Sequence, residues 1–327
     1  MKFSRSVEQD DFARTLDALL RDSDTVAAAR AWGRSDTGPG WKLWKKLADT
    51  GVTGLLVDED LGGVGGTHLD VVTAFERLGY HGAPGPWIES AVVVPMLIAD
   101  TIETDLSTAI GEGLLCASIT EPGATRALDA HVAARTFVAA GTRLYEGTPS
   151  ARLRSIDPVR TLFTVEAASE PLLELPSTVA ARAYDSGTLA CASMLVGAGE
   201  RLLDETVAYV SSRKQFGRVV GGYQAVKHCL ADVRVALDFA RPLIIGAAHE
   251  LSDSSTQSSR DVSAAKIAAN RAAYRAARAA LQLHGAVGYT AELDVSMWIL
   301  RVQALVTAWG TTAVHRDRIT TALTERI

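Results

Sequence analysis

Two strings in the second half of the chain carry side chains that suit a ligand with both phosphates and aromatic rings. The first string places Arg213, Gln215 and Phe216 close together and is followed by Gln224. An arginine guanidinium can bind a diphosphate through two parallel hydrogen bonds, and a phenylalanine offers a flat face to an aromatic ring. Glutamine amides add uncharged donors and acceptors. This first string therefore predicts contacts to a nucleotide-like ligand.

The second string has the same character and lies close to the C-terminus. It consists of Gln282, Leu283, His284, Gly285 and Ala286. Glycine lets the backbone approach a ligand closely, although Gly285 alone would equally well end a helix and Phe216 alone would equally well pack in a core. Nothing near His284 in the sequence supplies an acid or a nucleophile, so we expect it to pack rather than to catalyse. The joint occurrence of the two strings favours ligand binding.

The elements that must position these strings are mainly helical. Residues 1–113 read as helices interrupted by glycine loops, and residues 187–327 read as long helices with apolar residues at helical spacing. Four or five antiparallel helices of this length predict a bundle. The glycine-rich stretch at residues 60–66 lacks the third glycine of a dinucleotide fingerprint, and we interpret it as a loop.

Residues 114–186 have a different texture. Short apolar runs at residues 114–117, 131–134 and 161–165 are separated by proline, glycine and charged residues, which predicts strands. The segment is short, so we expect a small β-domain. The resulting fold class is mainly α with a small β middle domain, divided into 1–113, 114–186 and 187–327.

Composition restricts the function classes. The net charge is −5, and residues 187–327 hold 16 Lys/Arg against 12 Asp/Glu, which suits an anionic ligand but fits ordinary scatter of surface charge equally well. We expect no nucleic-acid partner. The chain has no membrane-length apolar run and no hydrophobic signal region, and its three cysteines lack metal-ligand spacing. We therefore expect a cytoplasmic protein with reduced thiols, no membrane association and no metal site.

Both strings resemble the cofactor-contacting signatures of the FAD-dependent acyl-CoA dehydrogenases, in the order and at about the spacing of that family. The resemblance covers nearly the whole chain and is weakest over residues 123–185. It implies an N-terminal helical domain, a β-domain and a C-terminal four-helix bundle. It also implies that the two strings reach across a subunit interface and hold the ADP portion of an FAD seated mainly in a neighbouring subunit.

The chain departs from the family at the positions that carry the chemistry. The reaction removes the α-proton of an acyl-CoA with a glutamate while hydride passes from the β-carbon to the flavin. The resemblance implies this glutamate at one of two positions, which are Trp309 and Gly187 here, and Thr188 stands where an arginine usually follows the second. An indole cannot act as a general base. We therefore predict no catalytic residue in this chain.

Two further departures concern the flavin. Residues 120–123 resemble the start of the family's flavin-facing loop, but Ala124-Thr125-Arg126 stands where small and acidic residues are expected. Ala313 replaces a glutamine that would face the flavin. The β-domain is also far shorter than is usual in the family.

Our hypothesis is an accessory subunit of a heteromeric acyl-CoA dehydrogenase in lipid metabolism. It would complete the FAD site of a catalytic sister subunit in an α2β2 heterotetramer. The chain resembles the steroid-degrading actinobacterial dehydrogenases that pair two different subunits in this way. That resemblance implies a steroid side-chain CoA ester as the substrate. One alternative is a self-sufficient homo-oligomeric dehydrogenase with a relocated base, for which Glu292, Asp294 and Asp317 are weak candidates. Another is a non-enzymatic helical interaction protein of the same fold.

Overall fold

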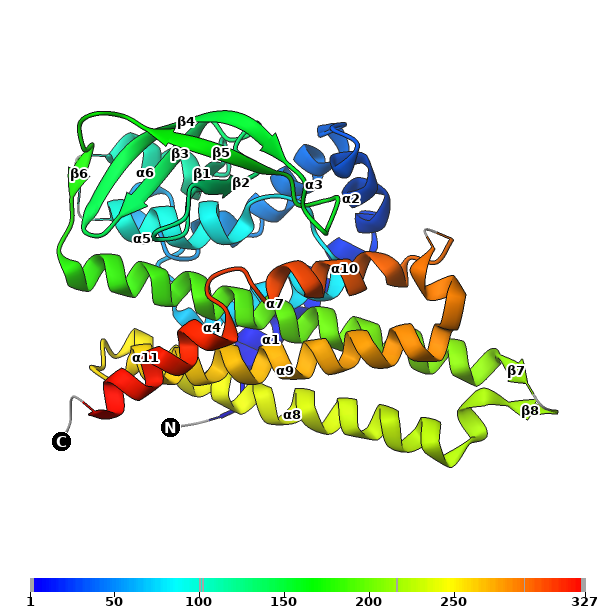
Figure 1. The fold of residues 1–327 in the computed structure, drawn as a ribbon. Helices are drawn as coiled ribbons and strands as arrows, with labels where there is room; N and C mark the ends of the chain where they lie inside the picture. Colours follow the sequence, from blue (N-terminus) through cyan, green and yellow to red (C-terminus); the bar gives the residue numbers. More distant parts are fainter. Residues whose placement is uncertain (1–2, 100, 102, 216, 291, 325–327) are drawn as a thin grey trace.

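The computed structural model describes residues 3–99, 101, 103–215, 217–290 and 292–324, and shows helices, a sheet and then a helical bundle in chain order (Figure 1). The first part is helical, as expected. Its α-helices are α1 (Val7–Arg21), α2 (Thr25–Gly33), α3 (Gly38–Ala48), α4 (His68–His81), α5 (Val94–Ile98) and α6 (Thr104–Gly111), and its shorter turns are η1 (Val52–Gly54), η2 (Glu59–Leu61) and the π-helical η3 (Glu89–Val93).

The middle part is one small sheet. Its strands are β1 (Ala117–Ile119), β2 (Arg126–Leu128), β3 (Arg135–Ala140), β4 (Arg143–Leu153), β5 (Leu162–Ala167) and β6 (Leu173–Glu174), in the order β1-β3-β4-β5-β2 with β6 beside β4. Only the β1–β3 pair is parallel among these strands. The strand expected at residues 131–134 is wrong, because a turn follows Asp129, whose φ of 51° lies in the left-handed region.

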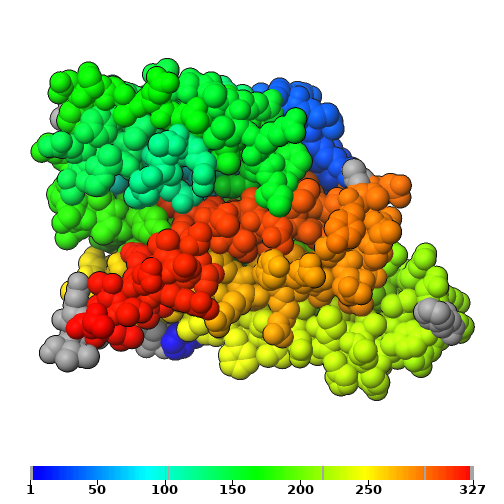
Figure 2. Space-filling model, in the orientation of Figure 1, coloured from blue at the N-terminus to red at the C-terminus, as the bar shows by residue number. Residues whose placement is uncertain are grey.

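The last part is the predicted bundle, built on a long central helix. Its helices are α7 (Ser177–Ser212), α8 (Gln224–Ser252), α9 (Ser258–His284), α10 (Val295–Leu305) and α11 (Thr312–Thr324), with the hairpin β7 (Lys214–Gln215) and β8 (Arg218–Val219) and the turns η4 (Val220–Gly222) and η5 (Gly285–Tyr289). The predicted boundary at residue 187 falls inside α7. Residues 183 and 185–199 of α7 are all buried, so the helix is enclosed on every side at its centre. Figure 2 shows α10 and α11 covering the middle of one face, between the strands and the helices α8 and α9.

Two glycines bring the N-terminal helices against this central helix. A Cβ on Gly79 of α4 would stand 2.1 Å from the Met194 carbonyl oxygen, and one on Gly197 of α7 would stand 1.9 Å from the Glu76 carbonyl oxygen. Neither contact leaves room for a side chain, so α4 and α7 approach backbone to backbone. The mainly helical fold with a small β-domain is confirmed.

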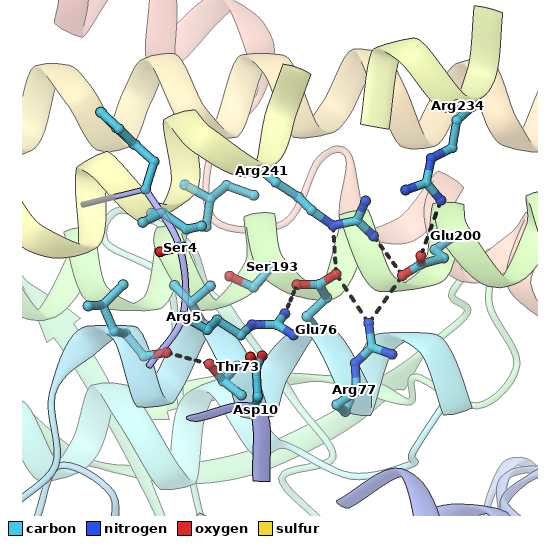
Figure 3. A pocket seen from close by; sticks show the side chains of 15 residues that line it. Ser4, Arg5, Asp10, Thr73, Glu76, Arg77, Ser193, Glu200, Arg234 and Arg241 are labelled. Carbon is cyan, nitrogen blue, oxygen red and sulfur yellow. Dashed lines mark hydrogen bonds and ion pairs between the residues drawn. The ribbon is translucent and has the colours of Figure 1, made fainter. Parts of the chain in front are cut away.

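An ionic cluster fastens the N-terminal segment to the bundle and lines a cavity of about 540 Å³ (Figure 3). Glu76 of α4 accepts from Arg5 at 2.5 Å and from Arg241 of α8 at 2.9 Å, while Glu200 of α7 pairs with Arg241 at 2.6 Å and with Arg77 at 3.1 Å. Burial opposes the charge of Glu76, but the surrounding arginines outweigh it and hold the pKa of Glu76 below its ordinary value. Four segments distant in sequence thus share one charge network. None of the described helices is both long and apolar enough to cross a membrane.

Candidate functional site

The first string lies where α7 gives way to α8. Arg213 caps the C-terminus of α7, Gln215 lies on β7 and Gln224 begins α8, and all three are exposed. No ion pair or hydrogen bond engages the Arg213 side chain within the described part of the chain. Phe216 lies outside the described residues. The exposed residues of this string therefore present unused donors at the surface.

The second string lies at the same end of the bundle. Gln282, Leu283 and His284 form the last turn of α9, and Gly285 and Ala286 begin η5. The ring of His284 stacks on Tyr209 of α7 with their centroids 4.3 Å apart, which ties the end of α9 to the end of α7 (Figure 1). The structure thus brings the two strings to one end of the bundle.

The individual roles within the second string differ. His284 is buried, and its Nδ1 lies 2.8 Å from the Ala280 carbonyl oxygen, which fits the packing role expected for it. Gln282 is exposed. Gly285 has a φ of 66°, and a Cβ added there would meet nothing within 4 Å. The left-handed conformation favours glycine, and the open space in front of it lets a ligand approach the backbone. The surface is suited to a phosphate-bearing group, and nothing in the bundle blocks it at this point.

Trp309 and Gly187, the two positions at which the resemblance implies a glutamate, are in contact. A Cβ on Gly187 would stand 3.0 Å from the Cε3 and Cζ3 atoms of Trp309 and 2.7 Å from Cγ2 of Val93. The Trp309 side chain is only 1% exposed. Its carbonyl oxygen lies 2.9 Å from Nε2 of His315 and accepts from the Thr188 hydroxyl at 3.4 Å. The indole is a packed element of the core at this place.

A cavity of about 370 Å³ lies beside Trp309. Apolar side chains from three parts of the fold line it, including Val93, Ile119 and Ala183. Thr120 and Pro122 of the loop after β1 also line it, so this loop lies at the cavity. No carboxylate belongs to the lining that the structure describes. The cavity can hold a largely apolar group; its lining also includes Arg143 and Arg318 but offers no base.

The candidates for a relocated base lie elsewhere. Asp294 is exposed and forms an ion pair with Arg30 at 2.6 Å, and Glu292 and Asp317 are also exposed. None of the three belongs to the lining of the cavity beside Trp309. Because a general base must reach the proton that it removes, these positions do not support a relocated base in that cavity.

A buried carboxyl that the sequence reasoning missed lies behind Trp309. Glu89 is 4% exposed on the π-helical turn η3, and burial raises its pKa although the charge of Arg160 opposes the shift. Its carboxyl interacts with the indole N–H of Trp309, but Oε2 and Nε1 lack hydrogen bonds of standard geometry within the described residues. Burial likewise raises the pKa of Asp129 to about 7. The sequence offered one signal for this buried acid, because Glu89 stands inside the apolar run that starts at Trp87.

Two family models match most of the chain. The model described as the N-terminal domain of acyl-CoA dehydrogenase matches residues 6–104, and the model described as the C-terminal domain matches residues 177–324. The second match includes both strings and starts at the first residue of α7. The small sheet lies between the two matches.

A relative by sequence and two solved structures agree with these matches. The chain is 29% identical over 300 residues to a protein named acyl-CoA dehydrogenase IpdE2 of Mycobacterium tuberculosis, covering 90% of each chain. It shares the fold of a chain from the Tcur3481-Tcur3483 steroid ACAD G363A variant, with a TM-score of 0.85, 20% identity and 98% of each chain covered. A chain from the ChsE4-ChsE5 complex of Mycobacterium tuberculosis gives a TM-score of 0.82 at 21% identity, with 99% of each chain covered.

Proposed function

The chain belongs to the acyl-CoA dehydrogenase family, and we propose that it serves there as the accessory subunit of a heteromeric, FAD-dependent enzyme. In this proposal a catalytic sister subunit carries the glutamate and most of the flavin. The present chain contributes the bundle end with Arg213, Gln215, Gln224 and the string that starts at Gln282. FAD, when bound, would supply the hydride acceptor for the dehydrogenation of an acyl-CoA thioester.

One contrast between two regions carries the proposal. At the bundle end, Arg213, Gln215 and Gln282 are exposed, and the guanidinium of Arg213 has no partner in the described part of the chain. At the positions of the implied glutamate, Trp309 is buried and packs against Gly187. An accessory subunit requires this combination, because it keeps what it presents to a partner and can lose what it would use itself.

The residues at the bundle end suit the ADP portion of FAD. The Arg213 guanidinium is able to hold two oxygens of the diphosphate at once, which a lysine does less well. The amides of Gln224 and Gln282 supply neutral hydrogen bonds, and Gly285 lets backbone come close to the ligand. We extend the same cross-interface role to Phe216, Leu283, His284 and Ala286, of which His284 acts by fixing the end of α9 against α7.

The partner and the substrate class are proposed on the relatives. Two of the structural neighbours come from pairs of differently named proteins, and one of these is called a steroid ACAD. We therefore propose an α2β2 arrangement, with a steroid side-chain CoA ester or another ring-bearing CoA thioester as the substrate at the partner's site.

The self-sufficient dehydrogenase is the second candidate. It would need a carboxylate in the cavity beside Trp309, and none belongs to the described lining. The third candidate, a helical interaction protein without flavin, would have no use for three exposed glutamines and an arginine without a partner in the described residues at one end of the bundle. The accessory subunit, the self-sufficient enzyme and the interaction protein differ in whether the chain binds flavin alone, only with a partner, or not at all.

The test compares the chain alone with the chain co-expressed with an acyl-CoA dehydrogenase encoded beside its gene. We expect co-purification, bound flavin absorbance and acyl-CoA-dependent reduction of an electron acceptor only for the pair. Colour and turnover from the chain alone would support the self-sufficient enzyme. Absence of flavin from every preparation would support the interaction protein.

A variant locates the contribution of this chain. Arg213→Ala in the complex should lower FAD retention on dilution by at least about tenfold, since a charge-assisted bidentate contact to a diphosphate is lost. Arg14→Ala on α1 is the matched control, because Arg14 is an exposed arginine far along the chain that pairs only with Asp11 of its own helix in the described structure. Equal FAD retention by Arg213→Ala and Arg14→Ala would refute the cross-interface role.

A further inference from the structure

A second group of arginines lies in the β-domain, away from both strings. Arg152, Arg154 and Arg160 line a cleft of about 440 Å³ between the end of α2 and the connection from β4 to β5. Arg152 and Arg154 are two residues apart on an extended segment, so their side chains leave it on the same side. Arg160 follows on the far side of the same connection. The three guanidiniums therefore come from one short stretch of chain.

The charge of this cleft is not neutralised by its own lining. Asp157 is the one carboxylate in the described lining, and it is completely buried in an ion pair with Arg301 of α10. Arg154 has no ion pair or hydrogen bond within the described residues. Arg152 donates to the Ser35 hydroxyl at 3.4 Å, and Arg160 faces the buried carboxyls of Glu89 and Asp129 only through its charge.

The three arginines of this cleft lie in the acidic part of the chain. Residues 1–186 hold 17 Lys/Arg against 26 Asp/Glu, so this part of the chain is acidic as a whole. Three arginines nevertheless gather at one cleft in which the single carboxylate is already paired. The guanidiniums of Arg152 and Arg154, which have no carboxylate partner among the described residues, are suited to phosphate oxygens, which they bind in pairs.

The connection between β4 and β5, next to which the arginines lie, is held in place by the buried Asp157. The Asp157 carboxylate accepts from the backbone N–H of Val159 at 2.9 Å and from Nε of Arg301. The last residue of α2, Gly33, packs closely against the same connection, since an added Cβ would stand 3.0 Å from the Pro158 carbonyl oxygen. A connection fixed at these two points keeps the backbone near the arginines in position before a ligand arrives, which reduces the backbone entropy lost on binding.

We propose that this cleft binds a phosphate- or diphosphate-bearing anion through Arg152, Arg154 and Arg160, with the hydroxyls of Ser155 and Thr161 as additional lining donors. The connection from β4 to β5 lies apart from the hairpin of β7 and β8, next to which the proposed FAD surface lies (Figure 1). Its volume exceeds that of one phosphate, so the ligand can be inorganic diphosphate or the phosphates of a nucleotide.

Calorimetric titration of the full chain at low ionic strength tests the proposal, because salt screens such contacts. The chain carries Arg213→Ala in all titrations, so that the bundle end does not contribute. The probes are inorganic diphosphate and adenosine 3′,5′-diphosphate. Equal affinity for both would assign the site to the phosphate itself, and tighter binding of the nucleotide would assign it to a nucleotide-borne phosphate.

Variants decide whether the cleft is responsible. We expect Arg154→Ala to weaken binding by about tenfold, Arg154→Lys to weaken it less, and Arg152→Ala combined with Arg154→Ala to abolish it. Arg143→Ala is the matched control, since Arg143 lies at the opposite end of β4 and pairs with Glu174. Circular dichroism checks that each variant is folded. No binding of either probe, or an equal loss in Arg143→Ala, would overturn the proposal, and neither result bears on the proposed FAD role.

Discussion

Trp309 and Gly187 are distant in the sequence but share one site, where ring carbons of the indole lie 3.0 Å from the place of a Cβ on residue 187. The two positions at which the family resemblance implies a glutamate thus form a single packed contact. The presence of glycine at 187 is explained by the presence of tryptophan at 309, because a larger residue would overlap the ring or Val93. The two departures from the family depend on each other.

The first prediction concerns this contact. Gly187→Ala forces a methyl group into a space bounded at 2.7 Å and 3.0 Å, so we expect the free energy of unfolding to fall by about 1–3 kcal/mol. Urea denaturation measures the change. Gly222→Ala is the control, because a Cβ there would meet nothing within 4 Å, and it should change stability by less than about 0.5 kcal/mol. Equal effects of the two substitutions would show that the Trp309–Gly187 contact is not tight.

The fold was predictable where its signals are local. Apolar residues at helical spacing indicated α3, α4 and the bundle helices, and the mainly helical class with a small β-domain is confirmed. The start of α7 at Ser177 was missed, although Pro176 directly before it is a usual helix-start signal. The exposed first turns of α7 lack the apolar periodicity from which the other helices were predicted.

Features that depend on long-range contacts were not predictable. The apolar run at residues 131–134 has strand-like composition, but the left-handed Asp129 and the turn after it decide its conformation. The burial of Glu89 behind Trp309 depends on two segments that meet only in the folded chain. The stacking of His284 on Tyr209 is of the same kind, and it ties the ends of the two helices that carry the strings to each other.

The second prediction concerns the cluster around Glu76. Glu76→Gln leaves Arg5 and Arg241 partly buried without their carboxylate, and we expect a loss of about 3–5 kcal/mol at neutral pH. Glu174→Gln removes an exposed pair with Arg143, and it should lower stability by less than about 1 kcal/mol. Denaturation with urea at pH 7 provides both values. A loss in Glu76→Gln as small as that in the control would contradict a structural role of the cluster.

The same carboxyl predicts a pH dependence. The pKa of Glu76 is lowered in the folded chain from an ordinary value of 4.5, so its contribution is fully present above about pH 4.5. The contribution is lost as the pH falls through the lowered value, because the folded state must then bind a proton that it disfavours. The difference in unfolding free energy between the native chain and Glu76→Gln should therefore shrink below pH 4.5. A constant difference across this range would argue against the shift.

The third prediction concerns His315, which holds the backbone of Trp309. Burial lowers the pKa of His315 from 6.5 to about 4, and the nearby charges of Lys266 and Arg318 act in the same direction. The unfolded state therefore binds a proton first, and stability falls as the pH drops from about 6.5 towards 4, by up to about 3 kcal/mol. His315→Gln should flatten this part of the stability profile. The exposed His228→Gln is the control and should keep the native profile, and a native profile in His315→Gln would refute the assignment.

The last prediction asks whether a glutamate at Trp309 would restore the chemistry. Trp309→Glu removes a packed indole and places a second carboxyl next to the buried Glu89, so we expect the chain to lose about 3–5 kcal/mol of stability through lost packing and the proximity of two buried acids. Trp309→Phe keeps an aromatic ring and should lose less. We expect no acyl-CoA-dependent reduction of an electron acceptor by the folded fraction of Trp309→Glu alone, because residues 124–126 and Ala313 also depart from the flavin-facing pattern. Turnover by this variant without a partner would show that the base was the only element that the chain had lost. That result would favour the self-sufficient enzyme over the accessory subunit.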